Sequence, residues 1–169
     1  MAISDGVSGL PAAAAASRSV CKQLAKLDKR GARLPPSDMS EEIRDGLSEE
    51  AGSDKSLLEG GATLVTAEFY NDYIRLWHAG DSRGYRLNPN SGQLDQLTQD
   101  HTLCSDLIEE GHIVDPSKYE GTLCKSVENL FVVSPYSDAP KPTTCLPTIN
   151  TGEILLLCSD GLCENLSNR

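Results

Sequence analysis

The 169-residue sequence lacks the features that mark membrane, secreted and nucleic-acid-binding proteins. No apolar stretch approaches the length of a membrane span, and no charged region precedes the alanine-rich residues 10–16 as it would in a signal peptide. Positive charge is scarce, with 15 Lys and Arg against 25 Asp and Glu and a net charge of -10. No basic stripe is present to replace the counterions of a nucleic acid. We therefore expect a cytoplasmic protein that binds neither nucleic acid nor membranes.

A C-x-x-C pair is also missing. The cysteines are Cys21, Cys104, Cys124, Cys145, Cys158 and Cys163, and the three histidines are scattered along the chain. Zinc sites and small disulfide-stabilised domains usually show closely spaced cysteines. The spacing therefore predicts buried thiols rather than a zinc site or a disulfide framework.

What is present fits one domain with a sizeable core. Apolar residues at three- and four-residue steps predict a helix from about Ala13 to Leu27, closed at Gly31. Ser37 or Ser40 is expected to cap a second helix, and residues 51–60 are expected to form a loop. A further helix is predicted over Thr102–Glu110, capped by Asp100 or Thr102.

Between the helices the apolar pattern changes to that of strands. The predicted strands are Thr63–Phe69, Tyr73–Ala79, Arg83–Leu87, Leu94–Leu97 and Glu153–Ser159. Asn71-Asp72 suits a hairpin turn, and the unbroken aliphatic run of the last strand predicts that it is buried. Residues 115–150 contain five prolines and little periodicity, so this stretch is expected to be functional or mobile. The order of elements predicts an α+β fold.

Three short motifs are the most informative part of the sequence. Asp5-Gly6 and Asp160-Gly161 are Asp-Gly corners near opposite ends of the chain, and Gly80-Asp81-Ser82-Arg83 lies between them. An aspartate at the end of a strand, followed by glycine, can present a carboxylate and a backbone carbonyl to one point. Several oxygen ligands from distant segments are how proteins hold hard cations.

These motifs, in this order, resemble the PPM-type (type 2C) metal-dependent serine/threonine protein phosphatases, above all the bacterial members. The similarity extends to Gly60-Gly61-Ala62-Thr63, residues 77–85 and residues 96–101. The resemblance implies two antiparallel sheets sandwiched between helical layers, an αββα arrangement with a metal cleft at one edge. Residues 112–150 fall where the family carries a variable flap.

The resemblance also implies roles for individual residues. Asp5 would bridge two Mn²⁺ or Mg²⁺ ions, the Gly6 carbonyl would ligate one of them and Asp160 the other. Asp81 would hold a third, weaker ion together with Asp160, or would instead form hydrogen bonds within its own turn. Serines beside the corners are expected to form turn and cap hydrogen bonds, and Arg83 either braces its turn or guards the cleft electrostatically.

The sequence departs from the family pattern in two ways. Val7 stands where some members carry a histidine proposed as general acid, although bacterial members usually have an apolar residue there. Family domains also carry an upstream phosphate-binding arginine and a downstream Asp-Asn block, and neither is found here. We therefore expect residues 1–169 to be the central part of one PPM-type domain and to be nearly inactive alone.

The function implied is hydrolysis of phosphoserine and phosphothreonine in a phosphorylated protein by a metal-activated water. A serine/threonine kinase would be the counteracting enzyme. Two alternatives stay open from the sequence: a non-catalytic phosphatase-like module that binds a partner or phosphopeptide, and an inactive fragment.

Overall fold

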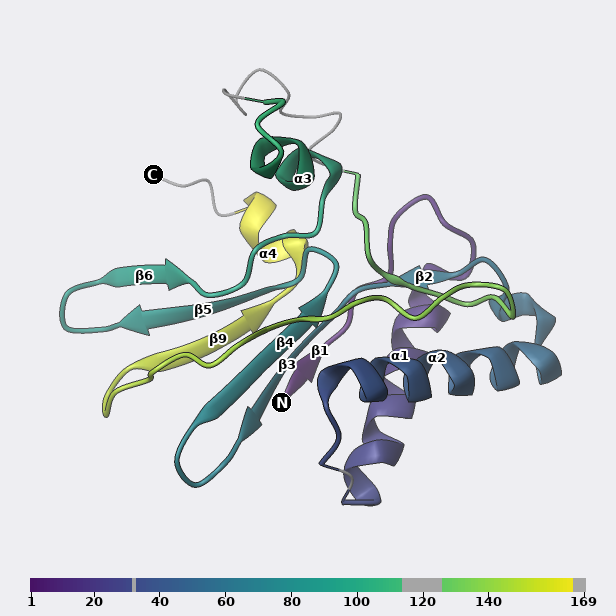
Figure 1. The fold of residues 1–169 in the computed structure, drawn as a ribbon, viewed down its shortest axis with the longest axis horizontal. Helices are drawn as coiled ribbons and strands as arrows, with labels where there is room; N and C mark the ends of the chain where they lie inside the picture. Colours follow the sequence, from purple (N-terminus) through teal and green to yellow (C-terminus); the bar gives the residue numbers. More distant parts are fainter. Residues whose placement is uncertain (32, 114–125, 166–169) are drawn as a thin grey trace.

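The computed structural model describes residues 1–31, 33–113 and 126–165, and these ranges form the predicted α+β fold (Figure 1). The helices are α1 (Ala13–Lys29), α2 (Pro36–Ser53), the short 3-10 helix η1 (Lys55–Leu57), α3 (Leu103–Glu109) and α4 (Asp160–Asn165). The strands are β1 (Ala2–Ile3), β2 (Gly61–Ala62), β3 (Leu64–Phe69), β4 (Ile74–Ala79), β5 (Arg83–Asn88), β6 (Gln93–Gln96), β7 (Phe131–Val132), β8 (Thr143–Cys145) and β9 (Ile154–Cys158).

One sheet carries the helical layer. Its strand order is β1-β3-β4-β8, all antiparallel, and we call it the helix-facing sheet. Alternate side chains of β3 and β4 point to α1 and α2, so Leu64, Trp77 and Ala79 pack in one core with Val20 and Ile43. All five of these residues have 0% of their surface exposed. Burial of the apolar stripe that the sequence predicts thus fixes α1 and α2 on this sheet.

Apart from the two-stranded pair β2-β7, a further sheet packs on the opposite face of the helix-facing sheet. Its strand order is β6-β5-β9, and we call it the outer sheet. Val65 and Leu76, which alternate with the helix-facing residues, form a second core with Leu157 of β9. The chain passes between the sheets at the corner formed by residues 80–82, so the β3–β4 and β5–β6 hairpins belong to different sheets. The expected pair of antiparallel sheets is confirmed.

Of the two long helices, α1 starts at Ala13 and is closed by Gly31 as predicted, whereas α2 differs from the prediction at both ends. Gly31 closes α1 with a φ of 66°, as expected of a helix C-terminal glycine. α2 begins at Pro36 without a side-chain cap and runs to Ser53, so the expected serine cap is wrong. The expected loop over 51–60 is wrong over 51–53, and η1 occupies Lys55–Leu57 within the remainder. Proline fits the first turn of a helix because the missing N–H has no partner there. Packing against α1 extends the helix beyond what its own sequence favours.

Strand β9 is less buried than the aliphatic run predicts. Leu157 and Cys158 are buried, but Ile154 and Leu156 are 50% and 38% exposed. Alternate side chains of a strand face opposite sides, and here one side faces the helix-facing sheet while the other is the external face of the outer sheet. The prediction of a fully buried strand is therefore wrong.

The segment predicted over 112–150 as a flap is described only in part, because residues 114–125 lie outside the described ranges. Its later portion contains β7 and β8, which the sequence did not reveal, and Phe131 and Val133 are buried in the core beside α2. Short strands formed by pairing with distant residues have no periodicity of their own, which explains why they were missed.

The described cysteines follow the prediction only in part. Cys21, Cys145, Cys158 and Cys163 are free thiols, but Cys158 alone among them is buried. Cys104 is disulfide-bonded, against the prediction, and Cys124 lies outside the described residues. Spacing along the sequence does not by itself reveal a disulfide, because the tertiary fold decides whether two Cα atoms approach closely enough.

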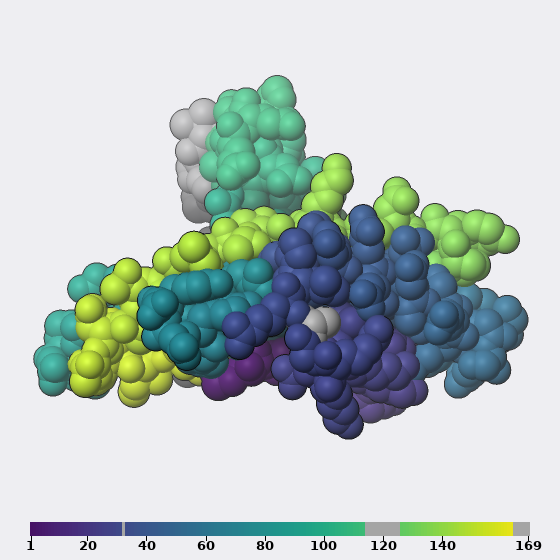
Figure 2. All heavy atoms as spheres, turned by 60° about the horizontal axis from the view of Figure 1, so that its bottom comes forward, coloured from purple at the N-terminus to yellow at the C-terminus, as the bar shows by residue number. Residues whose placement is uncertain are grey.

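Helix α3 projects from the body of the molecule (Figure 2). The Thr102 hydroxyl accepts a hydrogen bond of 3.2 Å from the Ser105 N–H, so Thr102 and not Asp100 caps this helix. Across the part of the chain that the structure describes, no helix has the length and apolarity needed to cross a membrane.

Candidate metal centre

The three predicted aspartates line the same cavity. Asp5, Asp81 and Asp160 face a space of about 520 Å³ together with Gly6 and Val7. Asp5 follows β1, Asp81 lies at the corner between β4 and β5, and Asp160 begins α4 directly after β9. Segments that are far apart in the sequence thus contribute residues to one cavity.

The backbone around Gly6 forms a short bridge to β2. The Thr63 N–H donates to the Asp5 carbonyl over 2.8 Å, and the Val7 N–H donates to the Gly61 carbonyl over 2.9 Å. In an antiparallel bridge of this kind the flanking residues form both hydrogen bonds, which leaves the carbonyl of the central residue outside the ladder. The Gly6 carbonyl is therefore a candidate ligand.

Thr63 connects the Asp5 segment to the Asp81 corner. Its hydroxyl accepts a hydrogen bond of 3.1 Å from the Asp5 N–H and lies 2.6 Å from the Ser82 hydroxyl, which is 1% exposed. Gly80 has a φ of 94°, and a Cβ there would lie 2.6 Å from the Thr63 methyl group. No role for Thr63 was predicted, although its place in the Gly-Gly-Ala-Thr block was a signal that could have found it.

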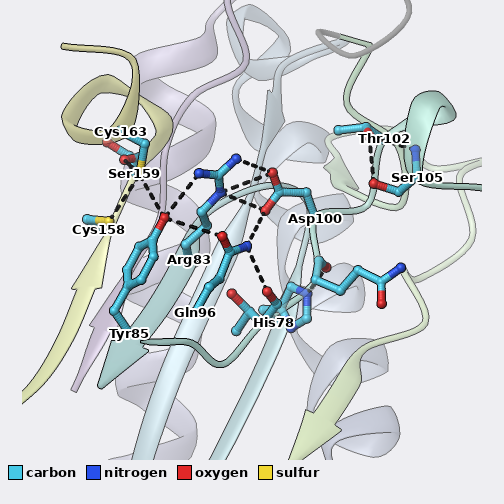
Figure 3. Close-up of polar contacts among 12 residues, drawn as sticks. His78, Arg83, Tyr85, Gln96, Asp100, Thr102, Ser105, Cys158, Ser159 and Cys163 are labelled. Atoms are coloured by element: carbon cyan, nitrogen blue, oxygen red, sulfur yellow. Dashed lines mark hydrogen bonds and ion pairs between the residues drawn. The ribbon is translucent and has the colours of Figure 1, made fainter. Parts of the chain in front are cut away.

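Arg83 braces the cavity wall, which is the first of the two roles considered for it. Its guanidinium pairs with both carboxylate oxygens of Asp100, with Nε–Oδ1 at 2.8 Å and Nη2–Oδ2 at 2.5 Å (Figure 3). A further hydrogen bond of 3.0 Å runs from Nη1 to the Tyr85 hydroxyl. These hydrogen bonds raise the pKa of Arg83 above its usual value. The arginine is thus committed to Asp100, and Asp100 acts as scaffold.

The carboxylates in the cavity repel one another. Burial, followed by the charges of Asp160 and Asp100, raises the pKa of Asp81 from 3.8 to about 6. Clustered carboxylates beside a backbone carbonyl are the donor set of a hard divalent cation, and a cation would relieve this repulsion. Within the described ranges, however, no three His, Cys, Asp or Glu side chains are placed to hold a metal ion. A cation here would therefore need the Gly6 carbonyl and water as additional ligands.

Asp81→Asn is expected to stabilise the metal-free protein. The amide keeps the shape of the side chain and removes a charge that is disfavoured by burial and by its acidic neighbours. After allowance for solvent screening the gain is about 1 kcal/mol, or about 2–4 °C in melting temperature. Thermal unfolding at pH 7 with a chelator tests this; an unchanged or lower melting temperature would contradict the assigned repulsion.

Two histidines form part of the scaffold beside the corner. The His78 and His101 rings stack with centroids 4.5 Å apart, and the Gly80 N–H donates to His101 Nδ1 over 3.1 Å. His101 Nε2 lies 2.8 Å from the Thr143 hydroxyl. Burial, and then the neighbouring ring of His78, lowers the pKa of His101 from 6.5 to about 4. Both rings thus support the corner through packing and hydrogen bonds.

Stability is expected to fall between pH 6.5 and pH 4 because of His101. The unfolded chain takes up a proton near pH 6.5, whereas the folded state resists protonation until about pH 4. The stabilisation is therefore complete above pH 6.5 and is lost as the pH falls through this window. Since the ring is partly exposed, the loss is about 1–2 kcal/mol. Urea unfolding measures the free energy of unfolding at pH 7 and pH 5. The decrease in this free energy between the two pH values should be smaller in His101→Gln than in the wild type; equal decreases would exclude His101 as the cause.

Comparison with known proteins identifies the family. No family profile matches the sequence. The serine/threonine protein phosphatase PstP of Mycobacterium tuberculosis (strain ATCC 25618 / H37Rv) is 33% identical over 174 residues, which cover 99% of this chain and 32% of that protein. The chain thus spans about a third of the length of this curated relative.

Solved structures agree with this relationship. The crystal structure of the M. tuberculosis serine/threonine phosphatase PstP/Ppp matches with a TM-score of 0.75 and 30% identity, covering 99% of this chain and 70% of that chain. The catalytic domain of PstP in complex with two manganese ions matches with a TM-score of 0.68 and 29% identity, covering 99% and 69%. On this identity and coverage, the chain belongs to the PPM-type family of serine/threonine protein phosphatases.

Proposed function

We propose that this chain belongs to a metal-dependent phosphatase that hydrolyses phosphoserine and phosphothreonine in proteins. One observation carries the proposal: Asp5, Asp81, Asp160 and Gly6, from three distant segments, line a single cavity. Residues 1–169 are the central part of one PPM-type domain, with residues 112–150 as its variable segment. The match to 70% of the PstP/Ppp chain supports this assignment.

In this proposal some residues of the cavity bind the metal ions and others position the ligands. Asp5, Asp160 and the Gly6 carbonyl would hold two divalent cations, and Asp81 with Asp160 would hold a third. When bound, these ions supply a water acidified for attack and neutralise the phosphoryl oxygens. Thr63 fixes the main chain of Asp5 and the corner of Asp81 through the hydrogen bonds described above. No serine of the chain is needed as a covalent nucleophile.

The comparisons support the metal and the substrate class. PstP binds two manganese ions in its solved complex, which supports Mn²⁺ as the ion here. The relatives are serine/threonine protein phosphatases, which supports a phosphorylated protein as the substrate. Use of Mg²⁺, a counteracting kinase and a cytoplasmic location stay predictions.

A second candidate is a non-catalytic phosphatase-like module that binds a partner. One observation favours it: the described residues contain no three metal-ligating side chains arranged as a site. Metal binding separates the candidates, because a pure binding module has no use for the carboxylates of the cavity.

Calorimetric titration of the chain with Mn²⁺ tests the proposal. We expect weak binding, and we expect Asp5→Ala and Asp160→Ala each to lower the affinity by about 10-fold or more, since loss of even a supporting residue costs 10–100-fold in metal sites. Asp138→Ala is the matched control because Asp138 is exposed and does not line the cavity. Equal affinities for the wild type and all three variants would refute the site.

A further inference from the structure

Two free thiols face each other at the edge of the candidate metal centre. The Cys158 and Cys163 sulfur atoms lie 3.6 Å apart, and neither is in a disulfide (Figure 3). Cys158 ends β9 and Cys163 lies on α4, so the pair encloses Asp160 within a six-residue segment. From this juxtaposition we propose that Cys158 and Cys163 form a reversible oxidation site that closes to a disulfide beside Asp160.

The surroundings give the two sulfurs different access to an oxidant. Cys158 is buried, with 5% of its surface exposed. Cys163 is partly exposed and lines the same cavity of about 520 Å³ as Asp160. It also lies 3.4 Å from the Tyr85 hydroxyl, which accepts a hydrogen bond from Arg83. A small oxidant such as hydrogen peroxide can therefore reach Cys163 through the cavity, with Cys158 positioned behind it.

The reaction proceeds in two balanced steps. The Cys163 sulfur attacks one oxygen of hydrogen peroxide, the O–O bond breaks, and a sulfenic acid and one water form. The Cys158 sulfur then attacks the sulfenic sulfur, the S–S bond forms and the S–O bond breaks. The hydroxyl leaves with the Cys158 thiol proton as a second water, as the Cys163 thiol proton left in the first. Two thiols lose two electrons in total, and one peroxide gains them. A small thiol such as dithiothreitol reverses the oxidation by exchange.

Closing the bond is expected to disturb the segment that carries Asp160. A disulfide requires a sulfur–sulfur distance of about 2.05 Å, so the two sulfur atoms have to approach each other from the present 3.6 Å. Rotation of the two side chains and adjustment of the short segment between them both contribute, and Asp160 lies on that segment. If the proposed function holds, disulfide formation is expected to weaken Mn²⁺ binding by about 10-fold. An effect of this size is typical when the groups that support a metal ligand are disturbed.

Mass spectrometry of one proteolytic fragment tests the oxidation site independently of metal binding. Cleavage after glutamate releases residues 154–164, whose only cysteines are Cys158 and Cys163. After treatment with hydrogen peroxide the wild-type fragment should lose two hydrogen atoms, and dithiothreitol should restore them. Cys145→Ser should behave like the wild type, because its sulfur lies outside the pair and contacts the Leu97 carbonyl.

Single variants distinguish Cys163, which reacts with peroxide, from Cys158, which then forms the disulfide. Cys163→Ser should keep a reduced fragment under peroxide, whereas Cys158→Ser should accumulate a sulfenic acid at Cys163 that dimedone captures. A wild-type fragment that keeps both thiols, or that gains oxygen atoms without losing two hydrogens, would overturn the proposal.

Titration with Mn²⁺ before and after oxidation separates this inference from the proposed function. If the reduced chain binds no Mn²⁺ while the disulfide forms, the metal site fails and the oxidation site stands. If Mn²⁺ binds and the disulfide does not form, the oxidation site fails and the metal site stands.

Discussion

Gly6→Ala is expected to destabilise the fold by about 3 kcal/mol or more, a decrease of about 10 °C in melting temperature. A Cβ at Gly6 would lie 2.4 Å from the Ala13 carbonyl oxygen and 2.5 Å from its carbon. These are main-chain atoms at the first residue of α1, so no side-chain rotation can relieve the clash. The helix is anchored in the core by Ala16 and Val20, both 0% exposed, and it therefore resists displacement.

The residues on either side of Gly6 are held in place and cannot shift to relieve this clash. Ala12 precedes the helix with a φ of 50°, in the left-handed region that residues other than glycine rarely adopt. On the other side, the Asp5 carbonyl is held by the Thr63 N–H. The glycine of the Asp-Gly corner is thus required for the close approach of residue 6 to the start of α1, whether or not its carbonyl binds a metal.

Gly52→Ala is the matched control for this prediction. Gly52 lies in α2, has no positive φ, and has no atom within 4 Å of the position of an added Cβ. Alanine favours a helix over glycine by up to about 1 kcal/mol, so this variant should be as stable as the wild type or more so. Thermal unfolding followed by circular dichroism compares the three proteins. If Gly6→Ala melts within about 1 °C of the wild type, the close approach is not a requirement of the fold.

The sequence predicted the elements with strong local patterns and missed those that depend on pairing at a distance. α1, the hairpin of β3 and β4, and the cap of α3 by Thr102 follow from periodicity, turn residues and capping, all of which are local. β7 and β8 have no such pattern, and the exposure of Ile154 depends on which sheet β9 joins and on which face it turns outward.

The candidate site likewise contains residues that local motifs reveal and residues that only the fold reveals. Asp5, Asp81 and Asp160 could be proposed because each sits in a short motif at a turn, and the fold places all three at one cavity. The Gly-Gly-Ala-Thr block pointed to the segment of Thr63 but not to its contact with Ser82, which the fold creates. The pairing of Cys163 with Cys158 likewise depends on how the chain turns from β9 into α4. The bracing role of Arg83 also needed the position of Asp100, 17 residues away in the sequence.

Breaking the Arg83–Asp100 pair is expected to cost about 2–3 kcal/mol of stability. The two side chains are only 29% and 17% exposed, and each carries several hydrogen bonds, so the remaining partner would be left with a poorly solvated charge. In Arg83→Met the Asp100 carboxylate would also lose its counter-charge beside Asp81, whose pKa is already raised in part by the charge of Asp100. Denaturant unfolding at pH 7 measures the loss.

A double-mutant cycle isolates the pair itself. Arg83→Met and Asp100→Leu together remove both charges, so the double variant should lose less than the sum of the single variants, with a coupling of about 1.5–3 kcal/mol. The Arg86–Asp95 pair of the β5–β6 hairpin provides the matched comparison, because it joins the same residue types over 2.7 Å at a more exposed site. Solvent screening should make its coupling clearly smaller.

The cycle also decides between the two roles considered for Arg83. A bracing residue contributes through Asp100, so its removal lowers stability and most of that loss disappears when Asp100 is removed as well. An electrostatic guard would act on the contents of the cavity instead: Arg83→Met would change Mn²⁺ affinity, leave stability near that of the wild type, and show no coupling to Asp100. The two-point pairing of the guanidinium with Asp100, together with its contact to Tyr85, leads us to expect the first result.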